Sequence, residues 1–249
     1  MQQRPDAGQI DTKAVQKRIL KIESLLSRFY GVPKQSAKRQ HPLDVLIGTI
    51  LSQNTNDKNS YKAFLNLKER YETWDEVADL SSRQLESLIK IAGLGKQKAK
   101  AILGVLHTLK ETGDYSLNHL RKLPDKEVLD YLTAFEGVGV KTASCVLLFS
   151  LRKNVCPVDT HVNRTVARLG IYSSSNPEKT FWFLFDIMPD TIAHSFHTNL
   201  IRLGREYCFP TNPACAQCPL LKICPYEEKN LDENTKTRFN DFMLLDNLH

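Results

Sequence analysis

Apolar residues along most of the chain recur every three or four positions, which is the period of an amphipathic α-helix. This spacing predicts helices within residues 15–29, 46–51, 63–67, 85–89, 99–106, 128–135, 141–151 and 160–169. Ser81 with Gln84 is a capping-box sequence, Asn176-Pro177 is a helix start, and Asp190 is expected to begin a last helix. No segment alternates apolar and polar residues between hairpin turns, so the sequence predicts an all-α protein.

The composition is that of a globular protein. The chain has 249 residues, of which 41% are hydrophobic and 25% are charged, enough for one large or two modest domains. No run of about 18 uncharged apolar residues is present, so we expect no membrane span and no membrane partner. Residues 1–12 are polar and lead into no apolar segment, so we expect a cytoplasmic protein, nucleoid-associated if the source is prokaryotic.

The net charge of +6 is unevenly distributed. The segment 227–249 holds three basic and six acidic side chains, a charge of −3, which leaves +9 on residues 1–226. A basic body suits a polyanionic partner such as nucleic acid. Within the acidic segment, apolar residues between 239 and 245 are expected to form a short docking helix.

Four of the six cysteines are clustered, with gaps of six, two and five residues: Cys208, Cys215, Cys218 and Cys224. Clustered thiols in a reducing compartment bind metal more often than they form disulfides. A zinc site usually pairs two short Cys-x-x-Cys units, whereas a single such pair with longer outer gaps favours a [4Fe–4S] cluster. Zinc and unliganded thiols are the alternatives. Cys145 and Cys156 lie in apolar contexts and are predicted to be core residues.

Two Gly-x-Gly turns precede predicted helices, Gly93-Leu94-Gly95 and Gly137-Val138-Gly139. The N–H groups at a helix start bind phosphate, although the same pattern also occurs in ordinary helical hairpins. Lys141 lies just after the second turn, where the helix dipole disfavours a cation and favours a neutral, nucleophilic amine. Asp159 lies 18 residues further on, at the predicted start of another helix.

These features together resemble the endonuclease III family of helix-hairpin-helix DNA glycosylases. Three motifs carry the resemblance: Gly137-Val138-Gly139-Val140-Lys141-Thr142-Ala143, Val158-Asp159-Thr160-His161 and the cysteine loop. The resemblance covers residues 14–226. It implies a two-domain all-α fold, with a six-helix barrel domain in residues 41–152 and a discontinuous iron–sulfur cluster domain in residues 12–40 and 153–226. Residues 227–249 form an acidic tail outside it.

The resemblance also implies an activity, namely base excision of damaged, oxidised pyrimidines followed by cleavage of the strand. Lys141 occupies the position of the catalytic lysine, and Asp159 occupies the position of the catalytic aspartate. The four clustered cysteines would hold the [4Fe–4S] cluster. The implied partner is double-stranded DNA that contains a damaged base or an abasic site, and the protein is expected to act as a monomer.

Further residues are expected by resemblance to contact DNA. Gln53 would fill the space left by an extruded base, and Leu94 would wedge into the opposite strand. The expected DNA-binding set is Gln53, Leu94, Gly95, Lys96, Gly137, Val138, Gly139 and His161. Lys98 and Lys100 are expected to meet phosphates with Lys96, and Lys153, Arg164 and Arg168 are weaker candidates for the same role.

The sequence departs from the family pattern at three places. Glu136 stands where the hairpin usually has proline, and Val140 stands where many relatives have a basic residue, so this hairpin is less positive than usual. The third departure is a set that looks more like the plant 5-methylcytosine glycosylases: Gln53, Asn54, Asp57, Ser60, Ala63 and Phe64. A preference for mismatched thymine or uracil, or for modified cytosine, therefore stays open.

Two other functions fit the sequence less well. A mismatch adenine glycosylase lacks the lysine and carries a glutamate near the position of Gly48, whereas this chain has Lys141 and no carboxyl there. A non-catalytic iron–sulfur protein that only binds DNA would not need both Lys141 and Asp159.

Overall fold

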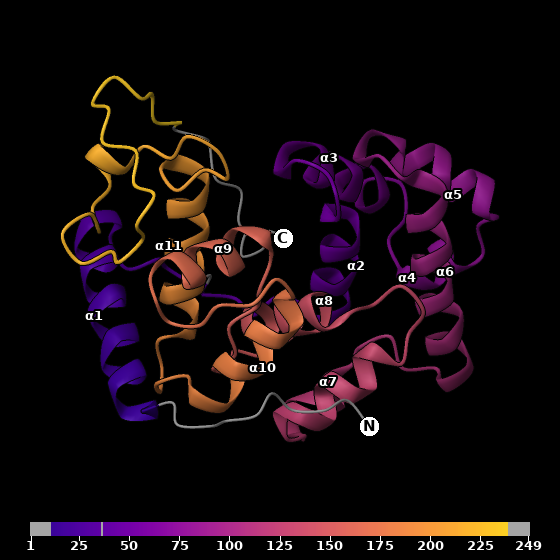
Figure 1. Cartoon of the computed structure of the whole chain (residues 1–249). Helices are drawn as coiled ribbons and strands as arrows, with labels where there is room; N and C mark the ends of the chain where they lie inside the picture. Colours follow the sequence, from indigo (N-terminus) through magenta and orange to yellow (C-terminus); the bar gives the residue numbers. More distant parts are fainter. Residues whose placement is uncertain (1–10, 36, 239–249) are drawn as a thin grey trace. The chain divides into compact units, whose positions relative to one another are not determined.

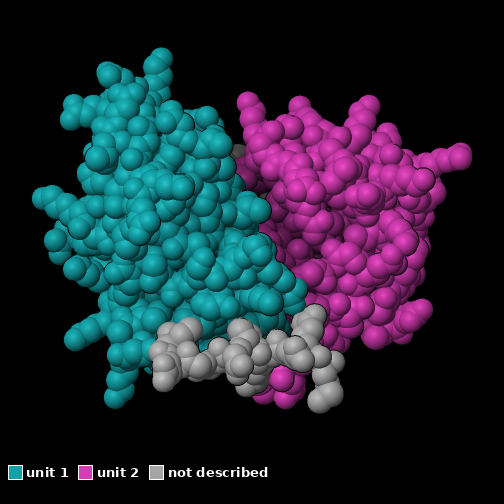
Figure 2. Space-filling view, in the orientation of Figure 1, with its two compact units in different colours: residues 1–34, 154–241 teal, residues 35–153, 242–249 magenta. Residues whose placement is uncertain are grey.

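The computed structural model describes residues 11–35 and 37–238. These residues form helices and no strand, which confirms the all-α prediction. The chain divides into two compact units, Met1–Lys34 with Asn154–Asp241 (unit 1) and Gln35–Lys153 with Phe242–His249 (unit 2), coloured separately in Figure 2. No helix in the described ranges is long and apolar enough to cross a membrane. The polar start of the chain and the docking helix expected at 239–245 fall outside the described residues.

Unit 2 is built around one central helix, α2. Its elements are α2 (Pro42–Ser52), α3 (Asp57–Lys68), α4 (Trp74–Ala78), α5 (Ser82–Ile89), η1 (Lys90–Ala92), α6 (Gly95–Thr112), η2 (Asn118–Lys122), α7 (Asp125–Thr133), α8 (Val140–Cys145) and η3 (Val146–Ser150) (Figure 1). Helix α2 is apolar on all sides, as expected of a helix surrounded by others. Helices α3, α6 and α8 pack against it, so both Gly-x-Gly turns lie at the ends of elements that rest on one core.

Local sequence signals set several helix boundaries in unit 2. Ser81 and Gln84 form the predicted capping box at the start of α5. The helix predicted over residues 141–151 is different in the structure, because the α-helical part ends at Cys145 and a π-helical segment continues to Ser150. In this wider segment the Ser150 hydroxyl donates to the carbonyl of Gln40, 2.7 Å away, which joins it to the chain before α2. A contact so distant in sequence leaves no trace in the local apolar spacing.

Unit 1 is built around α11. Its elements are α1 (Thr12–Tyr30), α9 (Thr160–Arg168), α10 (Pro177–Ile187), α11 (Ala193–Glu206) and the short 3₁₀ turn η4 (Cys215–Gln217) (Figure 1). Helices α1 and α9 pack against α11. Asn176 caps α10, and Pro177 is its first residue, as predicted.

The start of α11 corrects the sequence prediction at Asp190. The helix begins at Ala193, and the side chain of Asn154 accepts a hydrogen bond from the Ala193 N–H at 3.0 Å. The side-chain amide nitrogen of Asn154 donates to the Pro189 carbonyl, 2.9 Å away. A residue far away in the sequence thus accepts the hydrogen bond of the N–H group at the helix start. A search for a neighbouring Asp or Asn cap therefore selects the wrong residue.

The described part of the acidic segment, residues 227–238, packs onto the cysteine loop, and we call it the C-terminal strap. The Gln217 amide donates to the carbonyls of Glu233 and Thr235 at 2.8 and 3.0 Å. Arg238 donates its backbone N–H to the Glu206 carbonyl and stacks its guanidinium on the Phe209 ring. The strap is therefore an ordered part of unit 1. Cys145 and Cys156 are each 1% exposed, which confirms that they are core residues.

Candidate functional site

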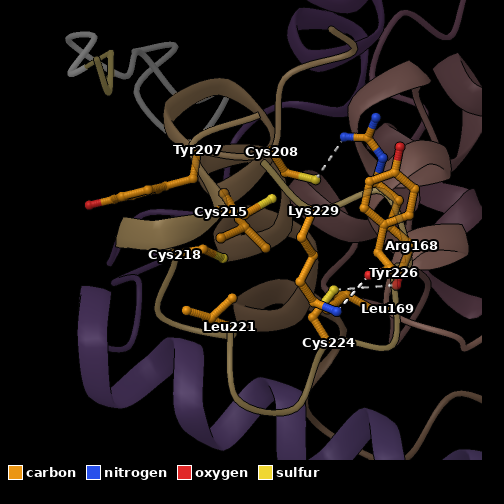
Figure 3. A pocket seen from close by; sticks show the side chains of 11 residues that line it. Arg168, Leu169, Tyr207, Cys208, Cys215, Cys218, Leu221, Cys224, Tyr226 and Lys229 are labelled. Atoms are coloured by element: carbon orange, nitrogen blue, oxygen red, sulfur yellow. Dashed lines mark hydrogen bonds between the residues drawn. The ribbon is translucent and has the colours of Figure 1, made fainter. Parts of the chain in front are cut away.

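The four clustered cysteines line one cavity in unit 1. It measures about 30 Å³, and Figure 3 shows the four thiols surrounding a common space. The end of α11, the short turn η4 and the loop that follows it position the four side chains. Leu169, Leu203 and Leu221 supply apolar walls, while Arg168 and Lys229 supply positive charge. Soft sulfur donors in an apolar, cationic setting suit an anionic iron–sulfur cluster.

Burial favours the protonated form of two of these thiols, Cys215 and Cys218. It raises the pKa of Cys218 to about 12 and also raises the pKa of Cys215. A thiol binds metal as the thiolate, so loading the cavity with metal releases protons.

Two arginines expected to meet DNA phosphates instead hold the loop that begins at Cys208. Arg164 donates to the carbonyls of Cys208 and Gly204 at 2.8 and 2.9 Å. Arg168 donates to the Phe209 carbonyl at 2.6 Å and to the Cys208 sulfur at 3.4 Å. Both guanidinium groups are thus engaged within unit 1, which corrects the expectation for these two residues.

The hairpin turn of unit 2 depends on a glycine at its first position. Gly137 has φ +83°, and a Cβ atom there would lie 2.8 Å from the Cβ of Ala101 on α6. Val138 is 5% exposed and donates its N–H to the Phe135 carbonyl. Gly139 is the N-cap of α8 and offers the helix start no side-chain cap. The turn therefore buries its apolar residue and presents backbone, as a phosphate site requires.

Lys141 lies in the first turn of α8, and Gln53 lies against the same hairpin. The Gln53 amide donates to the Gly137 carbonyl at 3.5 Å and to the Thr142 hydroxyl at 3.3 Å. Gln53 is the C-cap residue that directly follows α2. The structure thus brings two of the predicted site elements together within unit 2. The sequence analysis included Thr142 in the hairpin motif and gave it no role, whereas the structure shows that its hydroxyl accepts the Gln53 hydrogen bond.

The other Gly-x-Gly turn exposes its central residue. Leu94 has φ +50° and ψ 34°, a left-handed conformation that is rare for leucine, and 47% of its surface is exposed. Strained residues of this kind concentrate at functional sites. Gly95 begins α6, where an added Cβ would lie 3.1 Å from the Cγ of Glu86, and Lys96 follows with an exposed side chain.

Three other lysines expected near phosphates have partners in the protein. Lys98 is 2% exposed, and its ammonium donates to the carbonyls of Leu51 and Ala92, both at 2.7 Å. Lys98 is therefore a buried residue, which corrects that expectation. Lys100 forms an exposed ion pair with Glu136 at 2.5 Å. The Lys153 ammonium lies 3.1 Å from the carboxylate of Asp125 and donates to the Leu123 carbonyl.

Asp159 and His161 belong to unit 1. Asp159 is the N-cap of α9, as predicted, and its carboxylate accepts from the Val162 N–H at 2.8 Å. Burial lowers the pKa of His161, whose Nδ1 lies 3.2 Å from the guanidinium of Arg164. Lys141 and Asp159 therefore come from different units, and each lies at the start of a helix.

Comparison with known proteins identifies relatives that match most of the chain. The model of the HhH-GPD superfamily of base excision DNA repair proteins matches residues 47–186. Endonuclease III of Thermotoga maritima is 36% identical over 205 residues, which cover 82% of this chain and 92% of that protein.

Two solved structures have the same fold. One is a non-covalent complex of endonuclease III with DNA, with a TM-score of 0.71, 26% identity and coverage of 85% of this chain and 95% of that one. The other is a trapped covalent intermediate of endonuclease III with DNA, with a TM-score of 0.70, 25% identity and coverage of 88% and 97%. By its sequence, its helical fold and these relatives, the chain belongs to the endonuclease III family of the HhH-GPD base excision repair proteins.

Proposed function

We propose that this protein is a DNA glycosylase with AP lyase activity that removes oxidised pyrimidines from duplex DNA. The observation that carries the proposal is Lys141 in the first turn of α8, directly after a hairpin turn that presents backbone and that the Gln53 amide contacts. A duplex DNA substrate fits a protein of the cytoplasm that is associated with the nucleoid if the source is prokaryotic. Nothing in the proposed chemistry requires more than one copy of the chain.

The first step makes one bond and breaks another. The neutral amine of Lys141 attacks C1′ of the damaged nucleotide, and the N-glycosidic bond breaks so that the base leaves with the bonding electron pair. Asp159 accepts the proton that the Lys141 nitrogen loses as its bond to C1′ forms, and it stabilises positive charge that develops on the sugar. Its hydrogen bond from the Val162 N–H fixes the carboxylate at the start of α9.

The second step cuts the strand. Ring opening of the sugar converts the lysine adduct into a Schiff base between Lys141 and C1′. Loss of a proton from C2′ then expels the 3′ phosphate by β-elimination, and hydrolysis of the imine releases the lysine.

A base within the duplex must leave the stack before its C1′ can be attacked. We propose that Leu94 enters the stack as an apolar wedge and that Gln53 occupies the space left by the base. The exposed, left-handed Leu94 and the Gln53 contacts with the hairpin support these roles. Gly95, Lys96 and the Gly137–Gly139 turn of unit 2 would bind the flanking backbone, with His161 of unit 1.

We propose that Cys208, Cys215, Cys218 and Cys224 hold a [4Fe–4S] cluster. One zinc ion needs its four thiolates about 2.3 Å from a single point. In the described part of the chain, no three His, Cys, Asp or Glu side chains are gathered closely enough to hold a single ion. Four sulfurs spread around one cavity suit a wider cluster instead. The cluster would supply four-point attachment for the loop, while the chemistry on DNA belongs to the side chains described above.

Trapping with borohydride tests the nucleophile. Reduction of the Schiff base on a duplex with an abasic site should link the wild-type protein covalently to DNA. We expect Lys141→Gln to reduce this adduct by about 10³-fold or more. Lys126→Gln, which changes an exposed lysine on α7, is the matched control and should leave the adduct intact. Wild-type trapping by Lys141→Gln would show that another amine is the nucleophile.

Colour and metal content test the cluster. The purified protein should be brown and contain iron and sulfide. Cys218→Ser should lower both, whereas Cys145→Ala, at a buried cysteine away from the cavity, should retain them. A colourless wild-type protein with one zinc per chain would overturn the assignment.

A panel of duplexes tests the choice of base. Thymine glycol, uracil opposite guanine, thymine opposite guanine and 5-methylcytosine each represent one of the specificities discussed above. Oxidised pyrimidine preference predicts the highest kcat/KM for thymine glycol. A higher kcat/KM for one of the other three bases would make that base the preferred substrate and would not affect the proposed lyase chemistry.

A further inference from the structure

Lys98 is a buried cation on α6, and it lies between two exposed lysines of that helix, Lys96 and Lys100. It is 2% exposed, and in the described part of the chain its ammonium has no carboxylate within ion-pair distance. Lysine is almost never fully buried unless it is paired. A buried, unneutralised ammonium is costly to retain, so its hydrogen bonds must matter to the fold or to function.

The two hydrogen bonds of Lys98 reach the C-terminal ends of two different helices, and each of these helices leads into a loop. Its Nζ donates to the Leu51 carbonyl in the last turn of α2 and to the Ala92 carbonyl at the end of η1, both at 2.7 Å. A cation at the C-terminal carbonyls of a helix satisfies groups that lack partners within the helix and also complements the helix dipole. One ammonium therefore serves two such ends at once.

Each of these carbonyls lies two residues before a side chain that the proposed function places in DNA. Leu51 precedes Gln53, and Ala92 precedes Leu94. The contact with Leu51 connects to the hairpin as well, because Gln53 donates hydrogen bonds to Gly137 and Thr142 of the hairpin that carries Lys141. A line of hydrogen bonds thus runs from the wedge loop through Lys98 to the hairpin, entirely within unit 2.

We propose that Lys98 is a positioning residue that fixes the Leu94 loop and the Gln53 loop in one geometry, so that the two side chains enter the DNA together. The inference rests on the proposed function of this site. Lys98 does not touch DNA in this role. It acts through the backbone of the two loops, and it matters most when an intact base has to be driven from the stack.

Two substrates separate this role from a general loss of activity. A damaged base that is still attached must be unstacked and replaced by the two side chains, whereas an abasic site has no base to remove. We expect Lys98→Met, which keeps the length and apolar stem, to slow excision from the preferred duplex of the lesion panel about tenfold. Cleavage of an abasic site in the same sequence should change less than about twofold.

A fluorescent base adds a readout that folding defects do not mimic. With 2-aminopurine beside the lesion, wild-type binding should raise fluorescence as the stack opens, and Lys98→Met should reduce that rise at saturating protein. Lys110→Met is the matched control, because Lys110 lies on the same helix and is exposed, with ion pairs to Asp75 and Asp79. It should behave as wild type with both substrates. If Lys98→Met does not fold, Lys98→Gln provides the same comparison.

The outcomes distinguish the two proposals. A wild-type protein that neither excises a lesion nor cleaves abasic DNA would refute the proposed function itself. An active wild-type protein with Lys98 variants that lose both activities equally, or neither, would refute the positioning role alone. Selective loss of excision, with a smaller fluorescence rise, supports it.

Discussion

The two Gly-x-Gly turns of unit 2 share a sequence pattern and differ in what they present. In Gly137-Val138-Gly139 the central side chain is buried and the backbone is presented at the start of α8. In Gly93-Leu94-Gly95 the central residue is left-handed, and its apolar side chain is exposed. The first arrangement suits a phosphate backbone, and the second suits a base stack. The conformation of the middle residue therefore decides what such a turn can bind.

Replacing the first glycine of each turn should give the largest difference between them. Both residues have positive φ, but a Cβ at Gly137 would overlap the Cβ of Ala101, whereas a Cβ at Gly93 meets nothing within 4 Å. We expect Gly137→Ala to lower the free energy of unfolding by about 3–4 kcal/mol and Gly93→Ala by about 1 kcal/mol. Urea unfolding measures both, and equal losses would contradict the steric account of the hairpin.

Alkaline pH should reveal Lys98, the buried cation that joins the residues before the Leu94 turn to the end of α2. Burial lowers the pKa of Lys98 from 10.5 to about 8. Between these values the unfolded chain retains a proton that the folded chain has lost, so stability rises with pH in this window. Relative to Lys98→Met, the wild-type free energy of unfolding should increase by up to about 3 kcal/mol from pH 8 to above pH 10. A flat difference would show that the ammonium is not desolvated.

Truncating the middle residue of each turn should have opposite consequences. Val138→Ala removes buried methyl groups and should lower the free energy of unfolding by about 2 kcal/mol. Leu94→Ala changes an exposed side chain and should alter it by less than about 0.5 kcal/mol. Lesion excision should nevertheless fall about tenfold in Leu94→Ala, because the apolar wedge is lost. Excision kinetics and urea titrations of both variants test whether Val138→Ala mainly lowers stability and Leu94→Ala mainly lowers excision.

The smallest expected effect concerns the charge beside the hairpin. Glu136 pairs with Lys100 on the surface, and such exposed pairs contribute little to stability. Glu136→Gln should change the free energy of unfolding by less than about 0.5 kcal/mol. It releases one lysine for phosphate, so the plot of log Kd against log salt should steepen by up to about 1. An unchanged salt dependence would place Lys100 outside the DNA contact.

Residues whose role depends on local sequence were predictable. Helix periodicity gave the all-α fold, Ser81 and Asn176 capped the helices they precede, and Asp159 began α9 as expected. The clustered cysteines were recognisable because their spacing alone brings them to one loop. The placement of Lys141 after a glycine turn also follows from neighbours in the chain.

Residues whose role depends on distant contacts were not predictable. Lys98 reads as one of several lysines on a solvated helix face, and only the carbonyls of Leu51 and Ala92 show why it is buried. Arg164 and Arg168 suggest phosphate contacts until their hydrogen bonds to the cysteine loop are seen. Asn154 caps a helix 39 residues away. A periodic pattern indicates which face of a helix is buried, but it does not indicate which polar atoms of other segments form hydrogen bonds with that face.

The C-terminal strap limits how far the protein can be truncated at its C-terminal end. The family resemblance ends at residue 226, which makes that position an inviting stop codon for expression. Such a cut would remove Lys229 from the wall of the cysteine cavity and the carbonyls of Glu233 and Thr235 that bind Gln217. It would also remove Arg238 from the face of Phe209. A shortened gene should therefore extend at least to residue 238 if its product is to keep the lining of the cavity and the contacts of the loop around it.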